Sequence, residues 1–221
     1  MRQGDVISYL EMCQAEGVSL QQGMNFRLRG GASVILMSVR PGAPYADSVQ
    51  DEGRVLVYEG HDRPRMRDGA DPKTLDQQLE SERGTPTQNS LFFAAAGRAR
   101  DAGDPAELVR VYEKVRTGIW VYNGAFRLLD AWAEQIDGRR VFKYRLEVET
   151  DESVTTASAE PEKTRLIPTP VKLEVWKRDG GRCVKCGSTD NLHFDHIIPR
   201  SRGGTSLTST HLVAGSTQVE H

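Results

Sequence analysis

The stretch GRVLVYEGHDRPR, residues 53–65, joins a short apolar run to a loop dense in arginine. Glycines bound the apolar run and β-branched residues fill it, a pattern typical of a buried strand. The run ASVILMSV, residues 32–39, has the same character. Three longer β-like runs follow between residues 108 and 149, with turns predicted at Asn123-Gly124 and Asp137-Gly138. The sequence therefore predicts a domain built mainly from strands.

Helices are predicted on either side of these strands. Residues 4–17, GDVISYLEMCQAEG, carry apolar side chains at helical spacing and end at a glycine. Residues 71–82 and 87–103 are also predicted to be helical, and each range begins with a residue that favours an N-cap, an aspartate and a threonine. Together the strands and helices predict an α+β fold.

The composition is that of an ordinary soluble protein. The 221 residues are 38% hydrophobic and 27% charged, and no run approaches the ~18 apolar residues that a membrane helix needs. The N-terminus lacks the basic-then-apolar order of a signal peptide, so we expect a cytoplasmic protein with no membrane partner. The net charge of -2 gives no overall signature of nucleic-acid binding. Such a function would have to come from local patches.

A change of composition marks a boundary late in the chain. Residues 151–168 contain few large apolar side chains and many acidic, serine, threonine and proline residues, so we expect a solvated linker. The linker would separate a domain of residues 1–150, which includes the N-terminal helix, from a smaller module of residues 169–221.

The C-terminal module opens with an amphipathic helix and a Gly-Gly turn, and then presents Cys183 and Cys186. Two cysteines spaced C-x2-C direct two sulfurs to one tetrahedral centre, which is half of a zinc site. The run LHFDHIIP follows as a predicted strand that carries Asp195 and His196. Hydrolysis of a phosphodiester needs a divalent cation and a neutral imidazole. In this pair the aspartate can bind the cation and the histidine supplies the imidazole. Taken alone, a C-x2-C pair is more often a structural zinc knuckle or two buried thiols, and an Asp-His pair is usually a surface pair.

Residues 171–206 resemble the first half of the HNH, or ββα-metal, nuclease motif in its zinc-supported form. The resemblance implies that His196 is the general base and that Asp195 binds the catalytic cation, Mg²⁺ or Mn²⁺. It also implies that Cys183 and Cys186 form half of a structural Zn²⁺ site.

The rest of that motif is not evident in the sequence. The family continues with an asparagine, often a second cysteine pair, and a final metal-binding histidine on a helix. Residues 206–221, SLTSTHLVAGSTQVEH, contain no asparagine and no cysteine, and His211 and His221 are the candidates for the last histidine. We therefore expect an HNH module whose C-terminal half is missing or atypical. His193 or His211 could still complete the zinc site with the two sulfurs.

The N-terminal domain resembles the SRA domain, also called YDG, from about Gly30 to Glu149. The resemblance rests on a loop with a tyrosine, a strand that ends in Tyr-x-Gly before a basic loop, an Asp-Gln pair, and the segment from Tyr122 to Trp132. It implies an SRA-like twisted β-barrel, PUA-like in shape, with flanking helices. It also implies that the domain reads modified cytosine in DNA.

A reader of this kind flips the modified base into a pocket, because a methyl group cannot be enclosed inside a duplex. By position, Tyr45 and Tyr58 would stack on the flipped base. Asp47 would accept a hydrogen bond from its Watson-Crick edge, with Ser48 as the alternative. Glu59 stands where many members have threonine, and it could accept from the amine or from a hydroxymethyl group. Without the resemblance, tyrosines at strand ends would be expected to cap the core.

The residues next to the pocket are expected to contact DNA. Alternate arginines share one side of an extended loop, which suits contacts to phosphates or insertion into the gap left by a flipped base. A solvated charged loop is the simpler interpretation of such a run. The expected DNA-binding residues are His61, Arg63, Arg65, Arg67 and Asn89.

Together the two resemblances imply a prokaryotic, modification-dependent restriction endonuclease. It would bind duplex DNA that contains 5-methylcytosine or 5-hydroxymethylcytosine and hydrolyse phosphodiester bonds nearby. A flexible linker would make the cutting distance loose, and cutting both strands would favour a homodimer. Two alternatives are a reader of modified DNA that does not cut, and an RNA-binding barrel of related shape.

Overall fold

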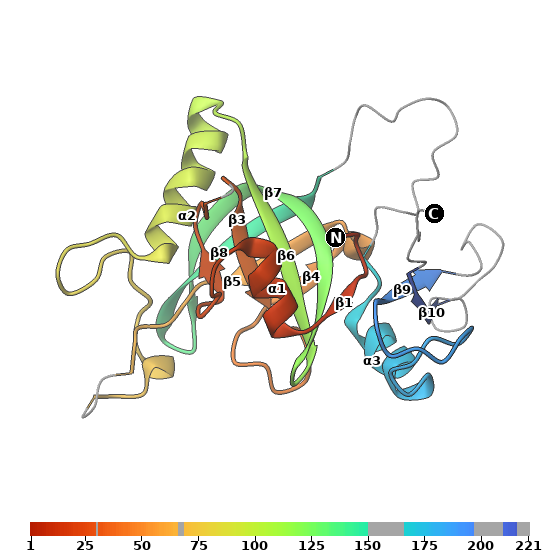
Figure 1. Cartoon of the computed structure of the whole chain (residues 1–221). Helices are drawn as coiled ribbons and strands as arrows, with labels where there is room; N and C mark the ends of the chain where they lie inside the picture. Colours follow the sequence, from red (N-terminus) through yellow and green to blue (C-terminus); the bar gives the residue numbers. More distant parts are fainter. Residues whose placement is uncertain (30, 66–68, 150–165, 197–209, 216–221) are drawn as a thin grey trace.

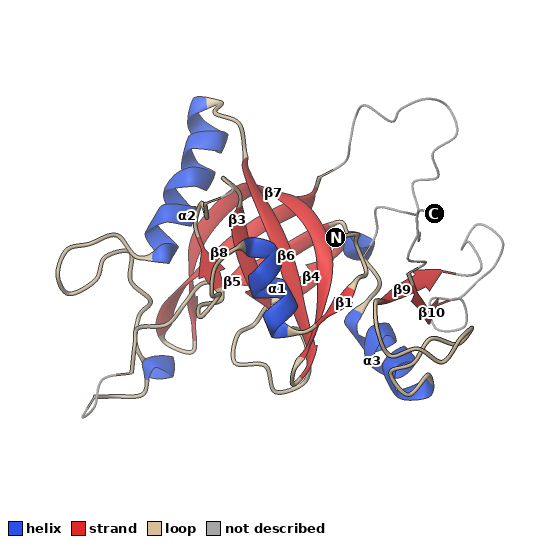
Figure 2. Cartoon of the chain, in the orientation of Figure 1, coloured by secondary structure: helices blue, strands red, loops and turns tan. Residues whose placement is uncertain are grey.

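The computed structural model describes residues 1–29, 31–65, 69–149, 166–196 and 210–215. The described elements are thirteen α-helices and β-strands together with three short 3-10 or π segments (Figures 1 and 2). In chain order the helices and strands are β1 (Val6–Ile7), α1 (Tyr9–Glu16), β2 (Met24–Asn25), β3 (Ser33–Met37), β4 (Ser48–Gln50), β5 (Val55–Glu59), α2 (Gln88–Gly97), β6 (Glu107–Arg116), β7 (Ile119–Ile136), β8 (Arg139–Val148), α3 (Thr169–Arg178), β9 (Leu192–His196) and β10 (Thr210–Ala214).

Eight strands form one strongly curved sheet, in the order β2-β3-β6-β7-β8-β5-β4 with β1 added on β7 (Figure 2). The neighbours β3 and β6 are parallel. The other neighbouring pairs in this sheet are antiparallel. The α+β class predicted from the sequence is confirmed. Among the described helices, none is long and apolar enough to cross a membrane.

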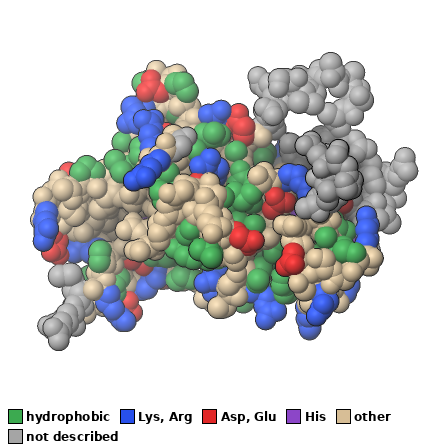
Figure 3. All heavy atoms as spheres, viewed as in Figure 1, with side chains coloured by type: hydrophobic (Ala, Val, Ile, Leu, Met, Phe, Trp, Pro, Cys, Tyr) green, Lys and Arg blue, Asp and Glu red, His purple; other side chains and the backbone are tan. Residues whose placement is uncertain are grey.

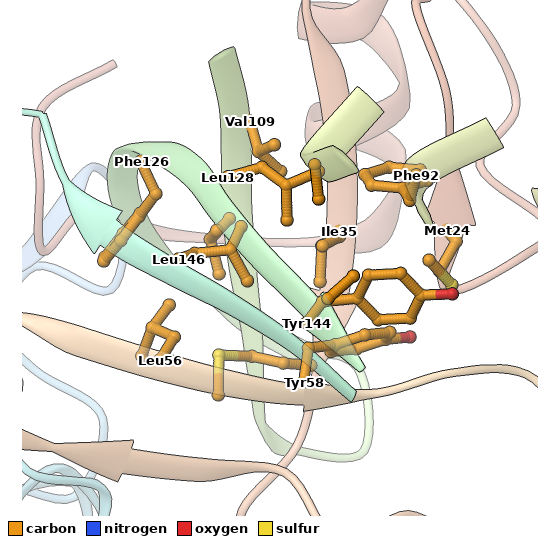
Figure 4. Close-up of a cluster of buried hydrophobic side chains, with 14 of the residues drawn as sticks. Met24, Ile35, Leu56, Tyr58, Phe92, Val109, Phe126, Leu128, Tyr144 and Leu146 are labelled. Atoms are coloured by element: carbon orange, nitrogen blue, oxygen red, sulfur yellow. The ribbon is translucent and has the colours of Figure 1, made fainter. Parts of the chain in front are cut away.

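The main core lies on the concave side of this sheet, under α2 (Figure 4). Phe92 of α2 is fully buried against the strands. Tyr58 of β5 and Tyr144 of β8 are cross-strand partners whose rings lie side by side in this core. The sheet therefore fixes Tyr58 from behind, which matters for the site described below.

Local sequence signals set several element ends as predicted. Helix α1 begins with a capping box, in which Glu11 N donates to Ser8 Oγ and Ser8 N donates to Glu11 Oε2. It ends at Gly17, whose φ of 67° suits a residue without a Cβ atom. Thr87 caps α2 through its side chain. The turn between β7 and β8 lies at Asp137-Gly138.

The helix predicted over residues 71–82 is wrong. Only a 3-10 turn, Pro72–Thr74, follows the expected N-cap at Asp71. Beyond it, Gln77 N donates to Arg140 O at 2.9 Å, and Gln77 Oε1 accepts from Phe142 N at 2.8 Å. The segment therefore bonds to β8 rather than to itself, and these tertiary hydrogen bonds override a weak helical pattern.

The turn predicted at Asn123-Gly124 is also wrong, because β7 runs through it. The register against β6 shifts between Val111 and Tyr112, which leaves Asn123 as the extra residue of a β-bulge. Gly124 has a φ of 103°, a backbone conformation that favours glycine over other residues. The chain reverses instead at Gly118, between β6 and β7.

The described part of the C-terminal module consists of α3, the Gly180-Gly181 turn, the cysteine loop and the antiparallel pair of strands β9 and β10. Its apolar side chains share one buried cluster with residues of β6 and β7. That cluster contains Val115, Val121, Ile167, Val171, Val175, Cys183, Leu192, Phe194, Leu212 and Val213. The module is thus packed on the sheet, and residues 151–165 of the expected linker lie outside the described residues.

The N-terminal strand joins the sheet to the module. Val6 of β1 pairs with Val121 of β7, and Asp5 forms a bridge with His193 of β9. Phe194 N donates to Gly4 O at 3.0 Å. A Cβ atom on Gly4 would lie 2.9 Å from Phe194 O, so the close approach of the two backbones requires glycine there.

A buried ion pair lies at the same junction. Lys172 of α3 and Glu113 of β6 are 2% and 1% exposed, and Lys172 Nζ lies 2.6 Å from Glu113 Oε2. Lys172 Nζ also donates to Asn123 Oδ1 at 2.7 Å, and Thr169 Oγ1 donates to Glu113. Burial favours the neutral acid, but these donors and the charge of Lys172 hold the pKa of Glu113 below its usual value.

Candidate nucleic-acid interface and nuclease module

A cleft of about 1330 Å³ opens at the end of the curved sheet, and it brings together residues from separate segments. The segment between β3 and β4 supplies Tyr45 and Asp47, β5 supplies Tyr58, and the loop after β5 supplies His61 and Arg63. The cleft extends to the β6–β7 hairpin, where Lys114 and Trp120 also line it. Residues predicted for base recognition therefore do gather in one place.

Three aromatic rings form the inner part of this cleft. The His61 ring lies 6.0 Å from the Tyr45 ring, with an interplanar angle of 33°, and 6.4 Å from the Tyr58 ring. Tyr58 is only 2% exposed, whereas Tyr45 and His61 are partly accessible. The Tyr58 hydroxyl is 3.2 Å from His61 Nε2. The ring that faces Tyr45 in this arrangement belongs to His61.

Asp47 is held by two backbone donors. Ser38 N donates to Asp47 Oδ2 and Glu59 N donates to Asp47 Oδ1, each at 3.0 Å. Burial is the main reason that the pKa of Asp47 is raised to about 6, although these two hydrogen bonds lower it. Ser48, the alternative acceptor, lies on β4, does not line the cleft, and accepts from Gln50 at 3.3 Å. The geometry therefore favours Asp47.

Glu59 is not in the cleft, and its expected role in the base pocket is not supported. Successive strand residues point to opposite sides, so Glu59 faces away from Tyr58. Its carboxylate lies 3.1 Å from Arg139 Nη2 and 2.9 Å from Lys143 Nζ. It also accepts from Ala46 N at 3.1 Å. Glu59 is 4% exposed and acts as a support for the loop that carries Tyr45.

Asn89 lines the cleft, but little of its side chain is accessible for the DNA contact that the sequence predicted. It is 2% exposed, and its side-chain amide brackets the backbone of His61. His61 N donates to Asn89 Oδ1, and Asn89 Nδ2 donates to His61 O, both at 2.9 Å. The structure therefore assigns Asn89 to positioning His61.

Gln77 gives a second anchor to the same loop, a role that the sequence did not reveal. Gln77 Nε2 donates to Gly60 O at 2.6 Å and to Asp62 Oδ1 at 3.2 Å. A Cβ atom on Gly60 would lie 2.7 Å from Asn89 Oδ1, so glycine is needed between the two amides. The Asp-Gln pair was visible in the sequence, but its partners lie on other segments.

The arginine loop contributes to the cleft only in part. Arg63 lines the cleft, and its Nε atom is buried with no partner in the described part of the chain. Arg65 is exposed, and Arg67 lies outside the described residues. Lys73 was not predicted, yet its Nζ lies 3.7 Å above the Tyr45 ring and 2.7 Å from Asp62 Oδ2. On the face in Figure 3, basic and acidic side chains are interspersed.

The nuclease residues lie on the module. Asp195 is exposed on β9 and is the cross-strand partner of His211 on β10. His196 ends β9 and pairs with Thr210, and its side chain lies outside the described part of the structure. His221 is also outside it.

The two cysteines occupy different environments. Cys183 is buried and Cys186 is exposed. A hydrogen bond from the backbone of Ala214 is the main cause that lowers the pKa of Cys183 to about 7. Residues 166–196 and 210–215 supply these two thiols but no group of three or more ligands arranged for a metal, and the same holds for the other described residues. The described residues therefore supply two candidate thiolate ligands, and the Zn²⁺ site stays a prediction.

Comparison with known families places the C-terminal module. The family model described as HNH endonuclease matches residues 183–209. The C-terminal module carries an HNH endonuclease match. The HNH resemblance seen in the sequence is thereby confirmed for this segment. The match spans the cysteine loop, β9 with Asp195 and His196, and the residues up to β10. No curated protein sequence matches the chain.

Several solved structures are similar to the chain. The SRA domain of SUVH5 in complex with fully methylated CG DNA is 25% identical, with a TM-score of 0.45, over 66% of this chain and 88% of that one. The modification-dependent TagI restriction endonuclease is 18% identical, with a TM-score of 0.44, over 97% of this chain and 74% of that one. KRYPTONITE in complex with mCHH DNA, an H3(1-15) peptide and SAH is 18% identical, with a TM-score of 0.46, over 72% of this chain and 34% of that one.

Proposed function

We propose that this protein binds duplex DNA containing 5-methylcytosine or 5-hydroxymethylcytosine and takes the modified base into the cleft by flipping it out of the helix. The observation that carries the proposal is the convergence of Tyr45, Asp47 and Tyr58 on one cleft. An extruded base needs a flat aromatic face and a polar group at its Watson-Crick edge. Tyr45 offers the accessible aromatic face and Asp47 the polar group, while Tyr58, which is 2% exposed, holds the neighbouring His61.

Asp47 is the acceptor for the exocyclic amine of cytosine in this proposal. Its two oxygens each accept one backbone hydrogen bond, and a carboxylate has about four lone-pair sites. Capacity for the base amine therefore remains. The two backbone bonds also fix the carboxylate, so binding does not have to order it.

Phosphate contacts would come from the cationic rim of the cleft. Arg63 and Lys114 line the cleft on different segments, and Arg65 is exposed beside it. Such contacts position a protein on DNA without reading the sequence. A local rim of this kind is compatible with the net charge of -2.

We further propose that the module cuts the bound DNA. The support is the HNH endonuclease match over residues 183–209. His196 would act as general base on the attacking water, and Asp195 would hold Mg²⁺ or Mn²⁺, which would stabilise the developing charge. Cys183 and Cys186 would give half of the ligands of a structural Zn²⁺. Cutting both strands needs two active sites, so a homodimer forms part of the proposal.

A reader of modified DNA that does not cut is the second candidate. One observation favours it: residues 206–221 contain neither the asparagine nor the second cysteine pair with which the HNH family continues. Recognition and cleavage reside in different parts of the chain, so one can operate without the other.

Methylated and unmethylated copies of one plasmid separate these candidates. Each is incubated with the protein and Mg²⁺ or Mn²⁺, and both nicking and gel retardation are recorded. Nicking of the methylated plasmid alone supports the endonuclease, and His196→Ala should then abolish nicking while retaining the gel shift. Retardation of methylated DNA without nicking supports the reader. Equal retardation of both plasmids would contradict modified-base recognition.

A further inference from the structure

His61 is held in place more firmly than a residue of an arginine-rich loop would need to be. Both polar atoms of its backbone bond to Asn89, at 2.9 Å each. The residue before it, Gly60, is bonded through its carbonyl to Gln77 at 2.6 Å. Asn89 and Gln77 are 2% and 0% exposed. The buried side-chain amides of Asn89 and Gln77 therefore fix the backbone at His61, and with it the position of the His61 Cβ atom.

The imidazole itself is fixed by a hydrogen bond and by close packing. His61 Nε2 lies 3.2 Å from the Tyr58 hydroxyl. A Cβ atom at Gly23 would lie 2.7 Å from that hydroxyl and 2.8 Å from His61 Nε2. Glycine is thus required at position 23 for the Tyr58–His61 pair to form. This close approach of a third segment leaves the pair little room to rearrange.

The hydrogen bond has a preferred direction. Burial raises the pKa of Tyr58 well above its usual value, so the group remains a phenol. His61 Nε2 is its hydrogen-bond partner among the described residues. If Nε2 carried the proton, the buried phenol O–H would have no acceptor, which costs about 1–3 kcal/mol. Tyr58 therefore donates to Nε2, and the proton of a neutral imidazole lies on Nδ1.

The imidazole is neutral at ordinary pH, because burial lowers the pKa of His61 to about 4. The Nδ1 atom makes no hydrogen bond to the part of the chain that the structure describes. It is also absent from the buried unpaired atoms of that part. An N–H donor on a partly accessible ring in the cleft thus remains available for a ligand.

We propose that His61 is the specificity-determining residue that separates modified cytosine from thymine, by donating from Nδ1 to N3 of the flipped base. The inference rests on the proposed function of the cleft. Thymine also carries a methyl group on C5, so a pocket that tests only that group would accept it. Its Watson-Crick edge differs, because thymine has a donor at N3 and an acceptor at O4. Cytosine has an acceptor at N3 and a donor at N4.

Asp47 and His61 together match the cytosine pattern. The carboxylate accepts from the amine, and the imidazole donates to N3. With thymine in the same position, Asp47 would face O4 and His61 would face N3–H, so both contacts would be lost and both pairs would repel. Discrimination based on unpaired buried polar groups is stronger than discrimination based on shape alone. Tyr58 acts as a positioning residue here, because it fixes the proton of His61.

Binding of three duplexes tests this inference. They are identical except at one position opposite guanine, which is 5-methylcytosine, unmodified cytosine or thymine. The wild-type protein should bind the methylcytosine duplex at least about tenfold more tightly than the thymine duplex, a difference of about 1.4 kcal/mol. His61→Phe keeps a flat ring but removes both nitrogens, and its preference should fall to within about twofold. Tyr58→Phe should lose part of the preference for methylcytosine over thymine, because without the Tyr58 hydroxyl the proton of His61 can lie on either ring nitrogen.

Tyr122→Phe is the matched control, since Tyr122 is a nearly buried tyrosine that does not line the cleft. It should discriminate as the wild type does. If His61→Phe rejects thymine as well as the wild type, the inference is overturned while the proposed function stands. If the wild type does not distinguish methylcytosine from cytosine, the proposed function fails and the inference fails with it.

A measurement on the wild-type protein tests the inference even if a variant does not fold. Nitrogen-15 chemical shifts of histidine side chains report which ring nitrogen carries the proton. His61 should show protonated Nδ1 and unprotonated Nε2 between pH 6 and 8. Protonated Nε2 in the free protein would overturn the inference.

Discussion

Two buried glutamates of the sheet each form an ion pair, but the two ion pairs stabilise different parts of the molecule. Glu59 on β5 pairs with Arg139 and Lys143 under the cleft. Glu113 on β6 pairs with Lys172 at the junction with the module. The partners of Glu59 both lie on β8, within the same sheet. The partner of Glu113 lies on α3, beyond residues 150–165 of the chain.

This difference shows which property each cluster controls. The Glu59 cluster can form within the sheet alone, and it supports the Tyr45 loop through Ala46. The Glu113 cluster forms only when α3 packs on β6 and β7. Breaking a buried ion pair leaves one charge without compensation. Damage to the first cluster should therefore affect base recognition, and damage to the second should affect the placement of the module.

The largest effect is expected for Lys172→Met. The change leaves Glu113, which is 1% exposed, as an unpaired buried charge, and should lower the free energy of unfolding by about 3–5 kcal/mol. Urea unfolding at neutral pH measures it. The double variant Lys172→Met, Glu113→Leu should recover at least half of the loss. A loss below about 1 kcal/mol in the single variant would show that the junction is open in solution.

A smaller effect is expected for Glu59→Gln. Arg139 would keep Asp62 at 2.6 Å, and Lys143 would keep the carbonyl of Ala46 at 3.3 Å. We expect a loss of about 1–3 kcal/mol in unfolding free energy, together with weaker binding of methylated DNA. The control is Asp130→Asn, which removes an exposed pair with Arg100 and should cost less than about 0.5 kcal/mol. Equal losses in the two variants would argue against a buried cluster.

The pH dependence of binding isolates the acceptor in the cleft. The pKa of Asp47 is about 6 because of burial, with Glu59 raising it and Lys143 lowering it. Affinity for methylated DNA should fall about tenfold per pH unit below 6, because only the carboxylate accepts from the base amine. Above pH 6 it should be flat. Asp47→Asn should remove this slope, and a slope that persists in the variant would assign the titration to another group.

The same group affects folding in the opposite sense. A carboxyl whose pKa is raised in the folded state binds its proton more tightly there than in the unfolded chain. Its contribution to stability is therefore full below its ordinary pKa near 3.8 and is lost as the pH rises through about 6. At neutral pH the ionised Asp47 therefore lowers the stability of the fold, but it supplies the hydrogen-bond acceptor in the cleft.

The smallest effect is expected for a longer connection. Ten Gly and Ser residues inserted between Glu149 and Leu166 should leave the overall dimensions in X-ray scattering almost unchanged beyond the added mass. Packing of the module sets its position, because Val171 and Val175 share a buried cluster with Val115 and Val121. A clear increase in the radius of gyration would mean that the connection sets the distance, as a flexible tether does.

Local signals in the sequence identified much of the fold. Gly17, Thr87 and Asp137-Gly138 end or begin elements as predicted, because each acts through its own backbone or nearest neighbours. The pocket residues Tyr45, Asp47 and Tyr58 also meet in one cleft as expected, although their roles remain predictions.

The errors arose where distant segments decide the structure. Asp71 to Glu82 has a helical pattern, but Gln77 bonds to β8 instead. The sequence predicted that Glu59 contacts the base, and only the folded sheet reveals that Arg139 and Lys143 occupy its oxygens. The pairing of Glu113 with Lys172 spans more than fifty residues and has no signature in either segment.

The central claim is that the cleft recognises modified cytosine, and one binding measurement tests it most directly. Affinities are measured for a duplex with one 5-methylcytosine and for the same duplex with cytosine, using the wild type and Tyr45→Ala. Loss of an aromatic wall should cost about 1–3 kcal/mol of base stacking. The account predicts that the wild type prefers the methylated duplex at least about tenfold, and that Tyr45→Ala binds both duplexes alike. Equal affinities for the wild type would contradict the account.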